Sequence, residues 1–389
     1  MSNATAQKKP QIFFPNLDGL RFFSFFVVFL FHSNKTIFSN LKGTQWYDLT
    51  NGLFQNGNLG VNFFFVLSGF LITYLLIKEK EFAGDINVGK FYVRRILRIW
   101  PLFYACIFLG FVVFPQIKIA LGGQPDEVAN IWYYVLLANN FDFMHSWPVV
   151  PDALILSVLW SVAVEEQFYL SWPVLVRFIK LRLLPVLMVG IIIGTLIFRS
   201  FYTNNDEHDY GVRYFHTFAV IGDMAWGGLL AYGAVFSKRF MQFWEALPKR
   251  VIAGIYVMAF AILFFKKDIL PPIPVVLVFE RLIIAIVFGA IIMEQNYSKH
   301  SLFKMQSLKR ISKLGVYTYG LYCLHFVGII AAGVVFDKLH LDRRSPGISF
   351  AEMLLALALS LAISIASYHW FESWFLKWKD KFAVIVKGK

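Results

Sequence analysis

Arg21 and His32 are polar residues eleven positions apart in a stretch that is otherwise strongly apolar. Eleven residues make almost three turns of an α-helix, so both side chains lie on nearly one face, about 16 Å apart along the helix axis. A cation inside a bilayer costs on the order of 2.5 kcal/mol or more, and such residues are usually functional. Because an imidazole can accept a proton near neutral pH, His32 is a candidate general base. The pair predicts chemistry inside a membrane.

Two adjacent carboxylates, Glu165 and Glu166, follow Ser161 in another apolar stretch. Glu165 lies one helical turn after Ser161 on the same face, whereas Glu166 points about 100° away. A carboxylate that reached His32 would orient the imidazole and stabilise its protonated form. The alternative is a structural ion pair with an arginine of another helix.

Three arginines, Arg94, Arg95 and Arg98, stand just before Pro101. Arg95 and Arg98 are three residues apart and share a helix face, so their guanidinium groups could clamp phosphate oxygens. The alternative is a plain cationic anchor at the membrane surface. Ser68 stands before Gly69, and such small residues typically mark close helix packing in lipid.

The composition requires that these residues be positioned by membrane helices. Of 389 residues, 58% are hydrophobic and only 16% are charged, whereas soluble domains carry about 25% charged residues. The net charge of +13 comes from basic residues that alternate with long apolar stretches. This pattern favours membrane topology over nucleic-acid binding.

A window of about 19 residues predicts ten membrane-spanning helices in an all-α polytopic protein. The predicted spans are 20–36, 57–77, 99–117, 157–176, 183–201, 214–236, 251–266, 274–293, 314–336 and 350–376. Lys and Arg are concentrated in alternate loops, which predicts that both termini are cytoplasmic. We expect one domain over 1–389, with a short N-terminal segment 1–17 and a cytoplasmic tail 377–389.

These motifs together resemble the acyltransferase family 3 of integral-membrane proteins. The resemblance rests on Arg21 with His32, the Phe-Phe-Val-Leu-Ser-Gly-Phe stretch around Ser68, the arginines before Pro101, and Trp160-Ser161 leading to Glu165-Glu166-Gln167-Phe168-Tyr169. Later segments agree in order, including Asp223 and the stretch from Tyr319 through Tyr322 to His325. The similarity covers nearly the whole chain.

The resemblance implies an O-acyltransferase of the cytoplasmic membrane. The donor would be cytoplasmic acyl-CoA, with acetyl-CoA expected, and the acceptor a hydroxyl of an extracytoplasmic or lipid-linked carbohydrate. Many members carry an esterase-like domain after the membrane domain, and this chain ends at Lys389. We therefore expect direct transfer or a separate extracytoplasmic partner transferase.

The predicted site residues fall into three groups. The catalytic candidates are His32, Glu165 and Glu166; the acyl-CoA-binding candidates are Arg21, Arg94, Arg95 and Arg98; and the substrate-binding or structural candidates are Ser68, Ser161, Asp223 and Tyr322. Members of the family often carry a basic residue two positions before the aspartate, where this chain has Ile221. This departure argues against an acceptor-binding role for Asp223.

The remaining histidines show no metal-ligand spacing, so we predict no metal site. His325 and His369 are expected to be hydrogen-bonded packing residues. The alternative function is an ion-coupled transporter or flippase of glycan-type substrates, because buried Arg, His and Glu would also suit an ion pathway. A covalent acyl-enzyme is the alternative mechanism.

Overall fold

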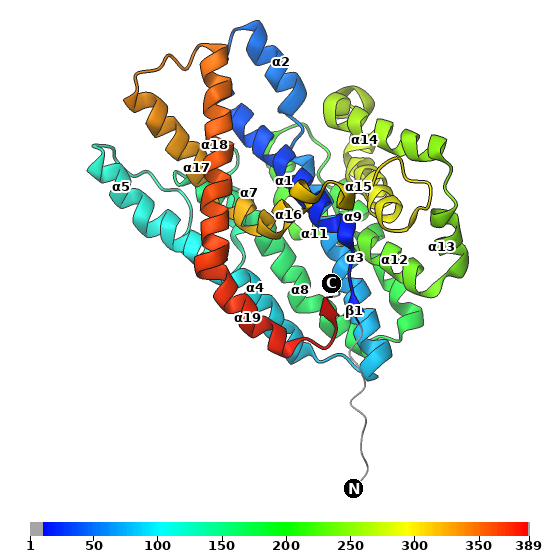
Figure 1. The fold of residues 1–389 in the computed structure, drawn as a ribbon. Coiled ribbons are helices and arrows are strands. Elements are labelled where there is room, and N and C mark those ends of the chain that lie inside the picture. Colours follow the sequence, from blue (N-terminus) through cyan, green and yellow to red (C-terminus); the bar gives the residue numbers. More distant parts are fainter. Residues whose placement is uncertain (1–10, 388–389) are drawn as a thin grey trace.

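The computed structural model describes residues 11–387 and is an all-α bundle of membrane type (Figure 1). The ten longest helices in this part of the chain are α1 (Pro15–Thr36), α3 (Leu59–Ala83), α4 (Val88–Phe108), α8 (Leu159–Phe178), α9 (Leu184–Ser200), α12 (Gly222–Phe236), α14 (Lys249–Ile269), α15 (Pro274–Tyr297), α17 (Thr318–Lys338) and α18 (Pro346–Ser367). Each overlaps one of the predicted spans. The all-α, multi-pass prediction is therefore confirmed.

Shorter elements connect these helices. They are α2 (Gln45–Phe54), α5 (Phe114–Ala120), α6 (Ile131–Val135), α7 (Asn139–Ser146), α10 (Glu207–Phe215), α11 (Thr217–Val220), α13 (Lys238–Glu245), α16 (Lys309–Leu314) and α19 (Ser373–Lys379). Two π-helical turns, η2 (Leu109–Val113) and η7 (Tyr368–Glu372), lie between α4 and α5 and between α18 and α19. The 3₁₀ turns are η1 (Phe38–Leu41), η3 (Leu154–Val158), η4 (Leu181–Leu183), η5 (Met305–Ser307), η6 (Gly315–Tyr317) and η8 (Asp380–Phe382).

Seven helical segments of residues 11–387 are long and apolar enough to cross a membrane, and an eighth qualifies if α13 and α14, bent by 86°, form one span. The predicted spans at α1 and α12 do not meet this standard. Arg21, His32 and Lys35 lower the apolar character of α1, and α12 has only 15 residues. Polar residues thus exclude α1 and short length excludes α12.

Close helix packing fixes the centre of the bundle, where α3 lies against α12. A Cβ atom at Gly69 would lie 2.0 Å from the Met224 backbone oxygen, and one at Gly227 would lie 2.0 Å from that of Val66. Only glycine permits this backbone approach, as expected for helices that associate in lipid. The packing prediction for Gly69 is confirmed, whereas the neighbouring Ser68 donates a hydrogen bond to Glu165 of α8.

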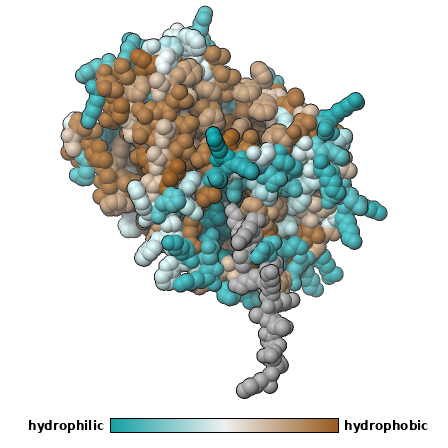
Figure 2. All heavy atoms as spheres, in the orientation of Figure 1, coloured by the Kyte–Doolittle hydropathy of each residue, from teal (hydrophilic) through white to brown (hydrophobic). Residues whose placement is uncertain are grey.

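The surface fits a lipid environment. Figure 2 shows a broad area of hydrophobic side chains on this face, with hydrophilic residues gathered at its borders. Large apolar side chains such as Phe178 and Val186 are 78% and 69% exposed. An exposed apolar area of this kind marks a membrane-contacting surface rather than a soluble one.

The segment between α5 and α8 is tied to the bundle by a polar contact. Lys118 Nζ lies 2.6 Å from Asp152 Oδ1, and the Asp126 backbone amide donates to Asp152 Oδ2. Partial burial acts to raise the pKa of Asp152, but these donors hold it below its ordinary value. The carboxylate therefore stays ionised and keeps the segment in place at neutral pH.

The two ends of the described chain meet. Strand β1 (Gln11–Ile12) pairs in parallel with strand β2 (Val386–Lys387). Most of the predicted N-terminal segment, residues 1–10, and the last two residues of the predicted tail, 388–389, lie outside the described residues. Both ends of the described chain are thus on one side of the bundle, here called the termini side.

Candidate active site

A group of arginines lies at the termini side of the interior. The Arg95 guanidinium stacks over the Tyr169 ring at 5.3 Å and the Phe91 ring at 5.6 Å. Arg98 is close enough to Arg21 to interact with it electrostatically. Arg21 Nη1 also forms an ion pair of 2.7 Å with Asp18. The structure therefore brings together Arg21, Arg95 and Arg98, here called the arginine cluster.

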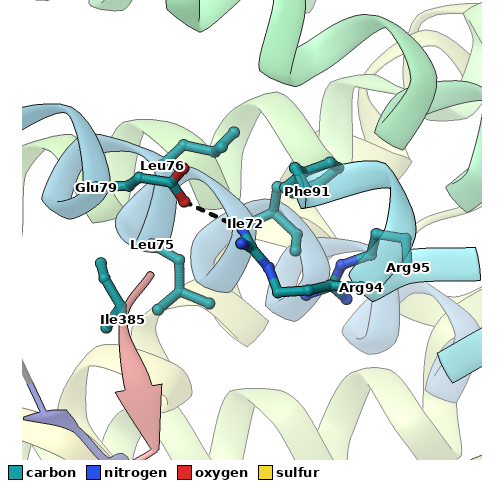
Figure 3. A pocket seen from close by; sticks show the side chains of 8 residues that line it. All are labelled: Ile72, Leu75, Leu76, Glu79, Phe91, Arg94, Arg95 and Ile385. Carbon is teal, nitrogen blue, oxygen red and sulfur yellow. Dashed lines mark hydrogen bonds and ion pairs between the residues drawn. The ribbon is translucent and has the colours of Figure 1, made fainter. Parts of the chain in front are cut away.

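Arg94 and Arg95 both line the small pocket shown in Figure 3, where Arg94 has partners of its own. Its Nη2 lies 3.0 Å from Glu79 Oε2, and its Nη1 donates to the Phe382 carbonyl oxygen at 2.9 Å. The pocket holds about 50 Å³, and Ile385 from the C-terminal segment forms part of its wall. Arg94 already has a carboxylate partner, so its contacts are those of a residue that fastens the C-terminal segment.

Glu165 lies next to the arginine cluster. Its Oε1 accepts a hydrogen bond of 2.8 Å from Ser68, and its Oε2 accepts one of 3.2 Å from Tyr169. Arg95 and Arg98 lie within electrostatic range of the same carboxylate. The charge of Glu165 is thus compensated by two hydroxyl donors and two cations, which is what a buried carboxylate requires.

The Glu166 side chain points about 100° away from Glu165 on α8, but Arg95 lies within electrostatic range of both carboxylates. Trp100 Nε1 donates to its Oε2 at 2.7 Å, while Oε1 is buried and has no hydrogen-bond partner in the described chain. Glu166 thus contacts α4 rather than α3.

Two hydroxyl groups lie beyond Glu165. With the arginine cluster and Glu165 they form a series of polar side chains, here called the polar path. Ser161 Oγ and Tyr322 OH lie 2.6 Å apart and share a hydrogen bond. Ser161 is one turn before Glu165 on α8, and Tyr322 lies within electrostatic range of Glu165. The pair therefore connects the Glu165 level of the bundle with α17.

His32 lies at the far end of this path. Its ring centroid is 5.1 Å from that of His325 and 4.7 Å from that of Phe326. The predicted contact between Glu165 and His32 is not formed, and within residues 11–387 no carboxylate lies within ion-pair distance of His32. Glu165 and His32 lie at different depths in the bundle, because Glu165 is level with Ser68 and Arg95, whereas His32 is eleven residues along α1 from Arg21.

Asp223 lies in another buried polar group, away from His32. Its Oδ2 is 2.8 Å from Arg281 Nη2 and accepts a longer hydrogen bond of 3.4 Å from Asn62. Arg199 and Glu280 form the neighbouring pair at 3.3 Å. These contacts link α12 to α15 and α9 to α15. The contacts of Asp223 are therefore those of a residue that holds helices together.

Three residues near the site were not among the predicted site residues. Tyr169 and Trp100 donate to the two glutamates, and His325 lies beside His32. Tyr169 follows Glu165 by one helical turn, so its spacing could have identified it. The sequence around His325 gave no such signal, because a histidine in an apolar helix is as consistent with a packing role as with a role in a site.

One group of possible metal ligands, Asp206, His208 and Asp209, lies within 4.8 Å in the described chain. Asp206 accepts a hydrogen bond from the Asp209 backbone amide at 2.8 Å as the N-cap of α10. Asp209 accepts one from the Asn204 amide at 2.9 Å. Helix capping and loop anchoring therefore account for these oxygens.

Comparison with known proteins identifies similar acetyltransferases. The chain is 32% identical over 212 residues to the O-acetyltransferase OatA of Staphylococcus aureus, covering 51% of this chain and 32% of that protein. It is 31% identical over 243 residues to the Staphylococcus aureus protein named "Putative O-acetyltransferase SACOL0978", covering 58% of this chain and 35% of that protein. The matched part is thus about a third of each relative's length.

No solved structure is significantly similar to the chain. The profile of a family described as "Acyltransferase domain" matches residues 14–369, which include α1 with Arg21 and His32 and reach into η7. Most of the chain is covered by this match, as the sequence motifs predict. The chain belongs to this acyltransferase family, the acyltransferase family 3.

Proposed function

We propose that the protein is an O-acyltransferase of the cytoplasmic membrane. It transfers an acyl group, with acetyl expected, from cytoplasmic acyl-CoA to a hydroxyl of an extracytoplasmic or lipid-linked carbohydrate. The observation that carries this proposal is the polar path from the arginine cluster through Glu165 and the Ser161–Tyr322 pair to the histidines. The names of the two similar Staphylococcus aureus proteins support acetyl transfer to oxygen.

The arginine cluster fits the anionic donor. Coenzyme A carries phosphates that cannot enter lipid, and guanidinium groups bind phosphate oxygens in a fixed fork geometry. Of the three arginines, only Arg21 has an acidic partner within ion-pair distance in the described chain. Arg95 and Arg98 are therefore the primary phosphate ligands in this proposal, with both termini on the cytoplasmic side.

The acyl group must then reach His32. Arg21 and His32 are about 16 Å apart along α1, so the thioester arm has to extend along the polar path rather than lie on the surface. The hydroxyl groups of Ser68, Ser161 and Tyr322 line the interior between these two levels and can hydrogen-bond to the amides of the arm. An extended donor explains why the cationic and basic ends of the site are separated.

At the histidine end, one ring nitrogen of His32 removes the proton from the acceptor hydroxyl. The acceptor oxygen forms a bond to the thioester carbonyl carbon, and the carbon–sulfur bond breaks. The thiolate leaves with the proton from His32, so the products are the carbohydrate ester and free coenzyme A. The Tyr322 hydroxyl is the donor best placed to stabilise the oxyanion, because it lies between Glu165 and His325.

The test is transfer of label from acetyl-labelled CoA into glycans of membranes that contain the wild-type chain or His32→Ala. His300→Ala, in a loop outside the path, is the control. Label with wild type and the control but loss of about 100-fold or more with His32→Ala would support the proposal. Equal label in all three would exclude His32 as the base, and no label in wild-type membranes with acceptor present would exclude acetyl-CoA as the donor.

A further inference from the structure

His325 is a buried imidazole beside the proposed base. It is 0% exposed, and its ring stacks on Phe326 at 4.8 Å with an interplanar angle of 28°. Phe25 and Phe29 contact it edge-on from α1. These neighbours hold the ring in one orientation against the helix that carries His32.

The hydrogen bonding of His325 defines its tautomer. Its Nδ1 lies 2.8 Å from the Tyr322 carbonyl oxygen, which can only accept, so Nδ1 carries the proton. Nε2 of the neutral ring is then an acceptor. That nitrogen is buried and has no hydrogen-bond partner among the described residues, which is costly for a polar atom.

The distance between the two imidazole rings is that expected for rings joined by one hydrogen bond. Two rings joined through facing nitrogens by a hydrogen bond of about 3 Å have centroids about 5 Å apart. The observed separation is 5.1 Å with an interplanar angle of 41°, and no hydrogen bond joins the described rings in this orientation, so the pairing requires rotation of the His32 ring. No carboxylate lies within ion-pair distance of His32 among residues 11–387 to orient it instead.

We propose that His325 is the positioning residue for His32: its Nε2 accepts the N–H of one His32 nitrogen and leaves the other nitrogen unprotonated and directed at the acceptor hydroxyl. The pair takes the place that a carboxylate–histidine arrangement would have filled. A neutral orienting partner also avoids a buried negative charge at this level of the bundle. This inference rests on the proposed function, which it deepens by assigning the partner of the base.

The first test compares two substitutions at one position. His325→Gln keeps an acceptor near the Nε2 position, whereas His325→Phe keeps the ring packing against Phe25, Phe29 and Phe326 but removes the acceptor. We expect His325→Phe to lower kcat about 100-fold with KM for acetyl-CoA within about twofold, and His325→Gln to retain kcat within about tenfold. His300→Phe is the control. If His325 only packs, the order reverses, and wild-type kcat in His325→Phe overturns the proposal.

A second test does not depend on transfer activity. Nitrogen-15 NMR of histidine-labelled protein in nanodiscs reports the tautomer of His32, whose signals are those lost in His32→Ala. The expected result is one neutral tautomer with a hydrogen-bonded nitrogen in wild type, replaced by a mixture of tautomers in His325→Phe. Unchanged His32 signals in His325→Phe overturn the proposal. If wild type transfers no label, the proposed function fails and this measurement alone decides the histidine pairing.

Discussion

Glu165 and Glu166 are neighbours in sequence whose carboxylates have different partners. Glu165 contacts Ser68 and Tyr169 on the side of the arginine cluster, and Glu166 contacts Trp100 of α4. A helix places successive side chains about 100° apart, so adjacent acids can serve separate purposes. The same substitution at each position should therefore affect transfer differently.

Replacing each glutamate by glutamine tests this separation. Glu165→Gln removes the charge that faces Arg95 and Arg98, and we expect transfer to fall about 10- to 100-fold. Glu166→Gln keeps an oxygen that can accept from Trp100 and removes a buried charge, so transfer should stay within a few-fold. Transfer rates at matched expression provide the comparison. Equal loss in both variants would contradict the assignment of the two faces.

The arginines permit a similar comparison. Arg95→Gln and Arg98→Gln each remove a cation with no acidic ion-pair partner in the described chain, and we expect KM for acetyl-CoA to rise about 10-fold or more while kcat changes little. Arg94→Gln instead breaks the ion pair with Glu79, so it should lower the melting temperature with a smaller effect on KM. Steady-state kinetics and thermal unfolding in detergent distinguish these outcomes. A KM effect confined to Arg94 would exclude Arg95 and Arg98 as the phosphate ligands.

The sequence predicted which side chains share a helix face better than it predicted contacts between helices. Periodicity within one helix correctly placed Arg95 near Arg98 and turned Glu166 away from Glu165. It could not predict whether Glu165 reaches His32, because that depends on the tilt and height of α8 relative to α1. His325 was predicted to be a packing residue for the same reason, since only the contact between α1 and α17 places it beside His32.

At the scale of elements, the positions of the long helices follow from hydrophobic length alone. Apolar stretches predict all ten helices because each must satisfy its backbone polar groups internally in lipid. The number of membrane crossings is harder to predict from hydropathy. Helices α1 and α12 are buried by neighbours and tolerate polar or small residues that a lipid-facing helix would not. Burial alone does not weaken the hydropathy signal, because α3 at the bundle centre meets the standard for a membrane span.

The contact between α3 and α12 provides a test at this scale. Gly69→Val would place side-chain atoms against the Met224 backbone, where a Cβ alone already comes within 2.0 Å, so the helices must separate. We expect a loss of about 1–3 kcal/mol or more in stability, seen as a lower melting temperature. Gly254→Ala is the matched control, because nothing lies within 4 Å of its added Cβ. Equal melting temperatures of the two variants would show that this interface is not tightly packed.

At the scale of the whole molecule, the arrangement predicts a direction of transfer. The arginine cluster lies toward the side where the two chain ends meet, and His32 lies toward the opposite side. The pocket beside Arg94 and Arg95 holds only about 50 Å³, so our proposal requires this side to open for coenzyme A to bind. Donor and acceptor should thus enter from different faces of the membrane.

Sealed vesicles of known orientation test this direction. We expect transfer only when acetyl-CoA is supplied on the face where a protease can remove a C-terminal tag. Supplying it on the other face should give no more than the signal of His32→Ala. Transfer from the face opposite the tag would mean that the donor enters near His32 and would exclude the path proposed for the thioester arm.

The pairing of β1 with β2 makes the described chain nearly a closed ring. Because its two ends are adjacent, a short peptide could join them while new ends are opened in a loop on the opposite side. Such a circular permutant would keep every helix contact but begin and end across the membrane from its parent. A reporter enzyme could then be attached beside the proposed acceptor entrance without lengthening the protein's natural loops.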